Sequence, residues 1–383
     1  MPDNRPGDAA FDLLCLLVRP SPDFVRARQL LDEGVDFRDV LDAAQKHSLR
    51  PQLIRSLAEL GGARVPPEAR SSLESFRQLH SAMSLANAEQ LGRIADALAA
   101  RGVRFAAFKG VTLAIILYGD LSAREYTDID LIVPSEALDA AEDVVEALGY
   151  VNDHSDRHFR HAFQGYQRQL AFTHPDRATV DLHWDFTGNH LPFPLSSADI
   201  WGALATVKVG HRPVPAIAGT DLALLLAGHG TKERWRSLGW VVDFAVLVER
   251  RGDLDWASIH ARARAQGCGD NVLLACALAE RLLGVAVPRA LALPLGRSAR
   301  VDMLASALIE ELRHDGHGPK AVRNLADIDV CDRRRDRIAA SIKLALTPTV
   351  SDYRAMPLPP SLWPLYRVTR PFRLAAHAVA SRF

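Results

Sequence analysis

The nine residues "TDIDLIVPS", numbered 127–135, decide how the centre of this chain is interpreted. Ile129 and Leu131 alternate with polar residues, a pattern that is typical of a half-buried β-strand. Asp128 and Asp130 stand at the start of this strand, although aspartate is depleted in strands and a buried, unpaired charge is costly. The pair therefore marks either a functional site or a solvated end of the strand.

Residues two positions apart in a strand point to the same face, so Asp128 and Asp130 share one side. At a rise of about 3.3 Å per residue, their Cβ atoms lie roughly 7 Å apart. Two carboxylates on one face can hold divalent cations, as in phosphoryl-transfer enzymes with two metals about 4 Å apart. Mg²⁺, or Mn²⁺ in its place, suits such a site because it binds carboxylate oxygens together with substrate phosphates. An ion pair with Arg124 is the structural alternative.

The segment "FKGV", residues 108–111, predicts a phosphate-binding turn upstream of the aspartates. The apolar run 103–108 predicts a short strand, and a short helix is expected to begin just after Gly110. A helix N-terminus offers free N–H groups and a positive dipole end, which bind anions. Glycine lets a phosphate approach the backbone, and Lys109 adds a positive charge. A phosphate site followed by a strand with two carboxylates favours nucleotide chemistry.

A second polar strand is expected at "VDLHW", residues 180–184. Asp181 and His183 share one face of this strand, and the apolar residues between them share the other. Asp181 is a candidate third carboxylate and a candidate general base for an acceptor hydroxyl. Simple solvent exposure is the alternative interpretation of Asp181.

The hydrophobic pattern predicts an α+β fold in three parts. Residues 1–102 form an N-terminal helical region, and residues 103–192 form a small mixed-sheet α/β core. Residues 193–383 form a C-terminal helical region that ends in a proline-rich, basic tail. Within the core, a helix over 135–148 is expected to be capped by Ser135. The predicted organisation is therefore helical, α/β, helical.

Composition limits the possible functions of the chain. Lys plus Arg number 46 and Asp plus Glu number 46, so no global field points to nucleic acid. No apolar run reaches the roughly 18 residues of a spanning helix, and the N-terminus lacks the pattern of a signal peptide. The four cysteines form no CxxC pair, which argues against a structural zinc site and favours a reducing compartment, the cytoplasm.

The combination of motifs resembles a known family. The segments "FKG", "YGDLSAREYTDIDLIV", "VDLHW" and "LLLAGHGTKERWRSLGWVVDFAVL" are similar to a bacterial family of uncharacterised nucleotidyltransferases within the DNA polymerase β-like superfamily. The resemblance implies a mixed sheet with a metal-binding pair at Asp128 and Asp130, and Asp181 as the third carboxylate. It places Lys109 and Gly110 at the phosphate loop, where the superfamily usually has Gly-Ser or Gly-Gly. The lysine leaves the nature of the donor open.

The resemblance also marks residues around this core. It implies nucleotide-binding positions at Tyr118 and Arg124. It marks His183 and His229 as further family positions of unknown role. The basic cluster around them adds candidates, so the residues expected as contacts to the acceptor or to phosphate are His183, His229, Lys232 and Arg236. A solvated helix end is the alternative interpretation of this cluster. Trp240 and Asp243 are interpreted as a packing anchor and its polar partner. The histidines of "HSDRHFRHAF", His154, His158 and His161, are interpreted as solvated residues near the mouth of the site.

These features predict an enzyme that moves a nucleotidyl group from a nucleoside triphosphate, such as ATP, to an acceptor hydroxyl with Mg²⁺. One alternative is transfer of another phosphate-linked group, such as a sugar from a nucleotide sugar. The other is a catalytically silent nucleotide-binding scaffold, although all three candidate carboxylates are present. The acceptor and the oligomeric state stay open. The basic segment "DRRRDR" and the basic tail are interpreted as a surface or a partner-docking face. Contact with an anionic membrane or with nucleic acid is the alternative, although the interleaved aromatics of a nucleic-acid platform are missing.

Overall fold

The computed structural model describes residues 6–61, 64–152, 168–188, 191–314 and 331–380. The N-terminal helices are α1 (Pro6–Val18), α2 (Phe24–Asp32), α3 (Phe37–Lys46), α4 (Arg50–Leu60) and the long α5 (Pro67–Ala100). The core elements that follow are β1 (Ala106–Ala107), α6 (Gly110–Tyr118), β2 (Asp128–Ile132), η2 (Ser135–Ala137), α7 (Leu138–Ala147), β3 (Val151–Asn152), β4 (Gln169–His174) and β5 (Arg177–His183).

The chain continues with a hairpin and a set of helices. These elements are η3 (Ile200–Gly202), β6 (Ala205–Val209), β7 (Arg212–Ala216), α9 (Gly219–Lys232), α10 (Leu238–Arg250), α11 (Trp256–Ala265), α12 (Gly269–Leu283), α13 (Arg289–Gly296) and α14 (Ala299–His314). The last unit contains α16 (Arg334–Leu346), α17 (Val350–Ala355), η5 (Pro360–Leu365) and α18 (Tyr366–Ala380). The predicted α+β class is confirmed.

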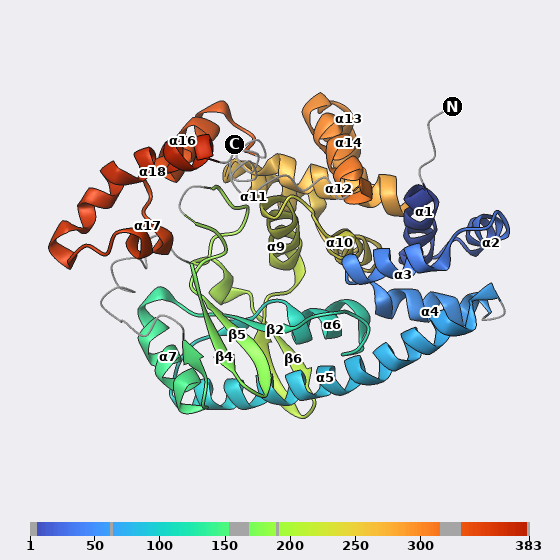
Figure 1. Ribbon diagram of the computed structural model, residues 1–383, viewed down its shortest axis with the longest axis horizontal. Coiled ribbons are helices and arrows are strands. Elements are labelled where there is room, and N and C mark those ends of the chain that lie inside the picture. The colour runs from blue at the N-terminus through green and yellow to red at the C-terminus, as the bar shows by residue number, and fades with distance from the viewer. Residues whose placement is uncertain (1–5, 62–63, 153–167, 189–190, 315–330, 381–383) are drawn as a thin grey trace.

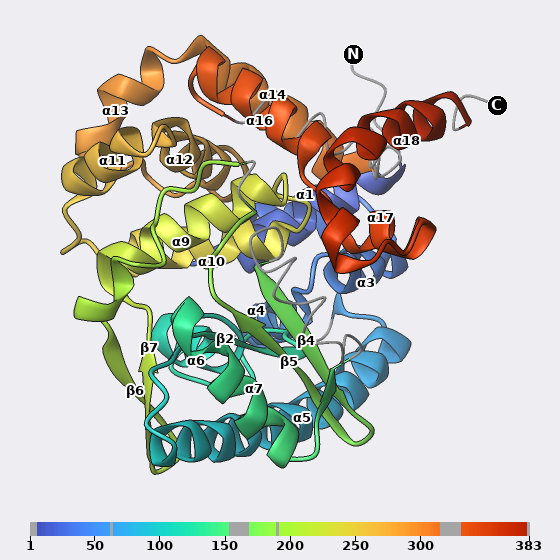
Figure 2. The same ribbon diagram turned by 90° about the vertical axis from the view of Figure 1, so that its left-hand side faces the viewer.

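The strands form one seven-stranded mixed sheet in the order β3-β4-β5-β2-β1-β7-β6. Its centre is the parallel pair β2 and β5, flanked by the antiparallel neighbours β1 and β4. The long helix α5 runs beneath the sheet, and α9 and α10 lie above it (Figure 1). The view turned by 90° shows the same layers, with the sheet between α5 and the C-terminal helices (Figure 2).

Two hydrophobic cores lie on the two sides of this sheet. One core joins α5 and α7 to the strands, and the other joins the N-terminal helices to α9, α10, α12 and α14. Helix α6 contributes to both, with Val111 and Ala114 in the first core and Leu113 and Leu117 in the second. The turn that begins α6 is therefore fixed from two sides, which is the rigid support that a binding site needs.

Three local expectations were wrong. The predicted strand over 103–108 is reduced to the two residues of β1. Ser135 caps no α-helix, because a 3-10 turn occupies 135–137 and α7 begins only at Leu138. The region after 193 is not wholly helical, because "ATVKVGHRPVPA", residues 205–216, forms the hairpin of β6 and β7. This hairpin extends the sheet beyond the predicted boundary at residue 192.

After helices α5 and α7 the chain passes through a glycine with positive φ, Gly102 at 71° and Gly149 at 92°, the conformation with which glycine commonly ends a helix. All four cysteines are buried free thiols. Among the described residues, no helix combines the length and the apolar character needed to cross a bilayer.

Candidate active site

The register of β2 and β5 brings the candidate residues together. Asp128 lies opposite Thr179, Asp130 lies opposite Asp181, and Ile132 lies opposite His183. Asp130, Asp181 and His183 each offer a ligand atom, and these atoms all lie within 4.8 Å of one another. Asp128 is two residues from Asp130 in the same strand and so points to the same face. We call Asp128, Asp130 and Asp181 the carboxylate cluster.

Asp130 is the buried centre of this cluster, with a residue exposure of 5%. Nε2 of His183 lies 3.0 Å from Oδ1 of Asp130, and Nζ of Lys109 lies 3.5 Å from the same oxygen. An ionised carboxylate only accepts hydrogen bonds, so Nε2 of His183 is the donor. Burial raises the pKa of Asp130, but Lys109 and His183 outweigh burial and hold this pKa well below its ordinary value.

His183 is neutral in this arrangement. Burial lowers the pKa of His183, and its bond to Asp130 opposes that shift only in part. The ring packs edge-on against Phe108, with the ring centroids 4.9 Å apart. His183 therefore holds Asp130 in position. The contact to phosphate or acceptor that the sequence suggested for His183 stays a prediction.

The other two carboxylates are disfavoured as anions. Burial, followed by the negative charge of Asp130, raises the pKa of Asp128. Burial and the charges of Asp130 and Asp128 raise the pKa of Asp181 to about 6. The amide of Gln169 donates to Oδ2 of Asp181 at 3.1 Å and orients it. A divalent cation would relieve the repulsion among these carboxylates, so this set of oxygen donors fits Mg²⁺ or Mn²⁺.

The turn at Lys109 and Gly110 lies directly beside β2. Gly110 has φ of 48°, and a Cβ built there would lie 3.0 Å from the backbone oxygen of Asp128. The hydroxyl of Thr112 donates to the carbonyl of Lys109 at 3.1 Å and closes the first turn of α6. Glycine suits this position because of the positive φ and the close approach, and the turn therefore packs directly against the backbone of Asp128.

Gly110→Ala is expected to lower the free energy of unfolding by about 1–3 kcal/mol. The loss has two causes, the positive φ and the contact with Asp128. Gly119→Ala is the matched control, since Gly119 has φ of 74° but nothing within 4 Å of a built Cβ. Urea denaturation of both variants should show the larger loss for Gly110→Ala. Equal losses would mean that the close approach to Asp128 contributes nothing.

The α9 side of the site contains His229 and Lys232. Burial lowers the pKa of Lys232, whose Nζ donates to the carbonyl of Phe186 at 3.2 Å. Burial, with the positive charges of Lys109 and Lys232, lowers the pKa of His229 well below its ordinary value. The His229 ring packs edge-on against Trp240, with centroids 5.1 Å apart. The charges of Lys109, Lys232 and Asp130 all influence the imidazole of His229, so these four side chains belong to one site.

Arg236 is held elsewhere. Its guanidinium bonds both the side chain and the backbone of Glu233, with a distance of 3.0 Å from Nε to the carbonyl oxygen. Glu233 also lies 3.7 Å from Lys232. Arg236 thus stabilises the C-terminal end of α9 through Glu233. These contacts do not point toward the carboxylate cluster.

Tyr118 and Arg124 meet at one buried carboxylate. The hydroxyl of Tyr118 donates to Oδ1 of Asp243 at 2.8 Å, and Nε of Arg124 donates to Oδ2 at 2.8 Å. His80 of α5 contacts the carbonyl of Arg124 at 3.0 Å. These bonds join the loop between α6 and β2 to helices α5 and α10. The sequence suggested Asp243 as the polar partner of Trp240, whereas its carboxylate accepts hydrogen bonds from Tyr118 and Arg124.

Two contributors were missed in the sequence. Gln169 orients Asp181, and Phe108 supports His183. The alternation of "QLAFTH" in β4 places Gln169 on the face of His183, its partner in the register, and this pattern was the available signal. His154, His158 and His161 lie outside the described residues, so their predicted place near the site has no structural counterpart here.

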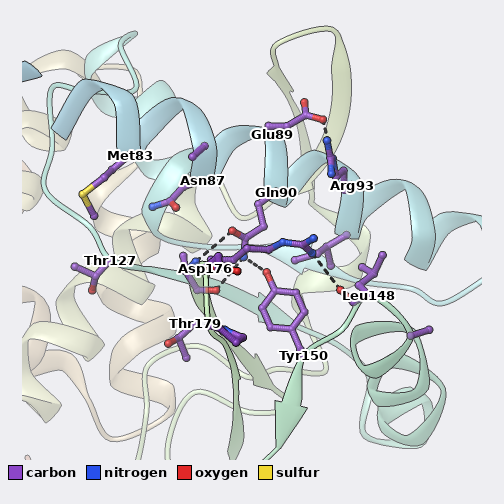
Figure 3. A pocket seen from close by; sticks show the side chains of 16 residues that line it. Met83, Asn87, Glu89, Gln90, Arg93, Thr127, Leu148, Tyr150, Asp176 and Thr179 are labelled. Atoms are coloured by element: carbon purple, nitrogen blue, oxygen red, sulfur yellow. Dashed lines mark hydrogen bonds and ion pairs between the residues drawn. The ribbon is translucent and has the colours of Figure 1, made fainter. Parts of the chain in front are cut away.

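A separate cavity of about 910 Å³ lies where α5 crosses the N-terminal ends of β2 and β5 (Figure 3). Thr127 and Thr179 form part of its wall, together with Asn87 and Gln90 of α5. The amide of Gln90 bonds the Tyr150 hydroxyl and donates to the carbonyl of Ala178 at 2.9 Å. Within the described part of the chain, none of the three carboxylates lines this cavity, so it is distinct from the carboxylate cluster.

Comparison with known protein families agrees with this geometry. The family model described as "Uncharacterised nucleotidyltransferase" matches residues 33–284, more than half of the chain. The match includes every strand of the described sheet, the carboxylate cluster and α9. This match supports a transferase-like enzyme. The chain belongs to this nucleotidyltransferase family, and no curated protein matches it.

Proposed function

We propose that this protein is a metal-dependent nucleotidyltransferase of the DNA polymerase β-like superfamily. It transfers a nucleotidyl group from a nucleoside triphosphate to an acceptor hydroxyl, with release of pyrophosphate. The observation that carries this proposal is the carboxylate cluster, whose three side chains share one face beside the Lys109–Gly110 turn. Such chemistry depends mainly on positioning and on neutralising phosphate charge.

Each residue has a role in this proposal. Asp128, Asp130 and Asp181 would hold Mg²⁺ or Mn²⁺, which neutralises phosphate charge and polarises the bond to be broken when bound. Lys109 and the N–H groups at the start of α6 bind the donor phosphates. Asp181 is also placed to accept the proton of the acceptor hydroxyl as a general base.

The silent-scaffold alternative is less well supported. A scaffold has no need for three carboxylates gathered on one face, where burial first, and the charge of neighbouring carboxylates second, raises the pKa values of Asp128 and Asp181. Transfer of a sugar from a nucleotide sugar would use the same metal and phosphate contacts. The Lys-Gly turn, in place of a serine-containing loop, keeps this donor as the second candidate.

Lys109→Ala tests the phosphate contact. The variant is expected to bind Mg²⁺–nucleotide more weakly by about 1.5–3 kcal/mol, the value of one charge-assisted hydrogen bond. Calorimetric titration with ATP, GTP, CTP and UTP, each with and without Mg²⁺, measures the loss. Thermal melting accompanies the titrations, since Lys109 also pairs with Asp130.

The exposed lysine of β6 provides a matched control for this experiment. Lys208→Ala removes the same side chain from a solvated position and should leave nucleotide affinity unchanged. If the folded Lys109→Ala variant binds every nucleotide as tightly as the wild type, the turn is structural and phosphate is bound elsewhere.

A further inference from the structure

Helix α18 presents its apolar side to solvent and two of its arginines, Arg370 and Arg373, to the protein. Phe372 is 73% exposed and Val368 is 60% exposed, whereas Arg370 is only 6% exposed. A surface helix of a globular protein normally has the opposite orientation, with its apolar stripe toward the core. We call this orientation, with the apolar side outward, the inversion of α18. Packing of the fold alone does not account for it, because exposed apolar side chains contribute little to stability.

The inner side of α18 is fixed by ion pairs to α17. Nη1 of Arg370 lies 2.6 Å from Oδ2 of Asp352, and Nε of Arg373 lies 2.7 Å from Oδ1 of the same carboxylate. Asp352 is 3% exposed and also caps α17 through Thr349. The two arginines leave α18 little freedom to rotate, so its orientation is built into the fold.

The outer side of α18 is a continuous apolar stripe. Leu365, the last residue of η5, is followed at helical spacing by Val368 and Phe372 of α18, and all three are exposed. Ala375 and Ala376 extend the same side and are exposed as well. No charged residue interrupts this stripe, and Arg367 flanks it.

Helix α16 has a comparable outer side. Ile338, Ile342 and Leu346 recur every four residues and are 62%, 53% and 43% exposed. The exposed cations Arg334 and Lys343 lie on the same helix. The helices α16, α17 and α18 gather at one edge of the molecule, drawn in red (Figures 1 and 2).

The charge of this unit is strongly one-sided. Residues 331–380 contain nine Lys and Arg but three Asp, a net charge of +6 in a chain whose total is zero. The three aspartates are Asp332, Asp336 and Asp352, all buried or half-buried, so the fully exposed charges of the unit are all positive. Apolar stripes flanked by cations alone are the pattern of helices that lie in the surface of an anionic bilayer.

We propose that the unit α16–α18 docks the protein on an anionic lipid surface. The outer side chains of α18 and α16 enter the boundary between headgroups and acyl chains, and the cations contact lipid phosphates. A second copy of the same surface is a poorer occupant, because a symmetric contact would place cations against cations. The attachment is peripheral, which agrees with the lack of a membrane-crossing helix among the described residues.

Co-sedimentation of the full chain with lipid vesicles tests this proposal. The wild type should bind vesicles that contain phosphatidylglycerol much more strongly than pure phosphatidylcholine vesicles, and high salt should weaken binding. The double variant Val368→Ser with Phe372→Ser should lose about tenfold or more in partitioning. Arg334→Gln and Lys343→Gln should each cost about fivefold. Melting temperatures should change little, since these side chains are exposed.

Leu85→Ser is the matched control, because Leu85 is 64% exposed on α5, away from the C-terminal unit. It should leave vesicle binding unchanged. The proposal fails if the wild type does not bind phosphatidylglycerol vesicles, or if the double variant binds them as well as the wild type. It also fails if light scattering shows a dimer that the double variant converts to a monomer, since a second copy then covers the stripe.

Discussion

Asp128→Asn and Asp130→Asn are expected to change the stability of the metal-free protein in opposite directions. The pKa of Asp128 is raised by burial and by Asp130, so its charge destabilises the fold at neutral pH and amide substitution removes that cost. The pKa of Asp130 is lowered, so its charge contributes stability above the unfolded pKa, and Asn forfeits it. Thermal melts without metal should show a higher melting temperature for Asp128→Asn and a loss of about 1–3 kcal/mol for Asp130→Asn.

Both substitutions should nevertheless abolish Mg²⁺-dependent transfer, because an amide does not hold the ion with comparable strength. The exposed Asp42 of α3 supplies the control, and Asp42→Asn should change neither property. A structural role of the pair through Arg124 is already disfavoured, since Arg124 donates to Asp243. If both variants lose stability to the same extent and keep activity, the carboxylates are structural and the catalytic account is wrong.

The second large effect is expected at Asp243, which is 2% exposed. Asp243→Ala leaves the charge of Arg124 and the hydroxyl of Tyr118 buried without their acceptor. Loss of one partner of a buried ion pair costs about 3–5 kcal/mol, which is a large part of the stability of a typical protein. Urea denaturation should show this loss directly.

Tyr118→Phe separates the hydroxyl from the ion pair. It removes one hydrogen bond to Asp243 and should cost only about 0.5–1.5 kcal/mol. If Asp243→Ala costs no more than Tyr118→Phe, Arg124 finds another partner and the loop between α6 and β2 does not depend on Asp243. Nucleotide contacts at Tyr118 and Arg124 stay predictions, which the same two variants can test by titration.

The sequence predicted the local part of the site well. The period of two in β2 places Asp128 and Asp130 on one face without any knowledge of neighbours, and the glycine at 110 signals the turn. The pairing of β2 with β5 is different in kind. It joins residues about fifty positions apart, so the strand pattern offered Asp181 only as a candidate third carboxylate, and no local spacing places it opposite Asp130.

Other features depend on tertiary contacts that no local pattern contains. Pro213 and Pro215 argue against a strand in β7, since proline cannot donate to a ladder. The strand is tolerated because β1 pairs with it only at Ala216, which leaves most of β7 with β6 as its one neighbour. The orientation of α18 could not be predicted from the sequence either. Its helical pattern shows an apolar stripe, but only the tertiary contact of Arg370 with Asp352 determines which side faces the protein.

A crystal of the protein grown with Mn²⁺ and a non-hydrolysable nucleoside triphosphate tests the central claim most directly. Anomalous scattering locates Mn²⁺ without assumptions about the rest of the density. The account predicts at least one Mn²⁺ at about 2.2 Å from oxygens of Asp128 and Asp130, with Asp181 beside it and the donor phosphates near Lys109. Bound nucleotide with no Mn²⁺ at these carboxylates, or Mn²⁺ and nucleotide bound together elsewhere, would contradict it.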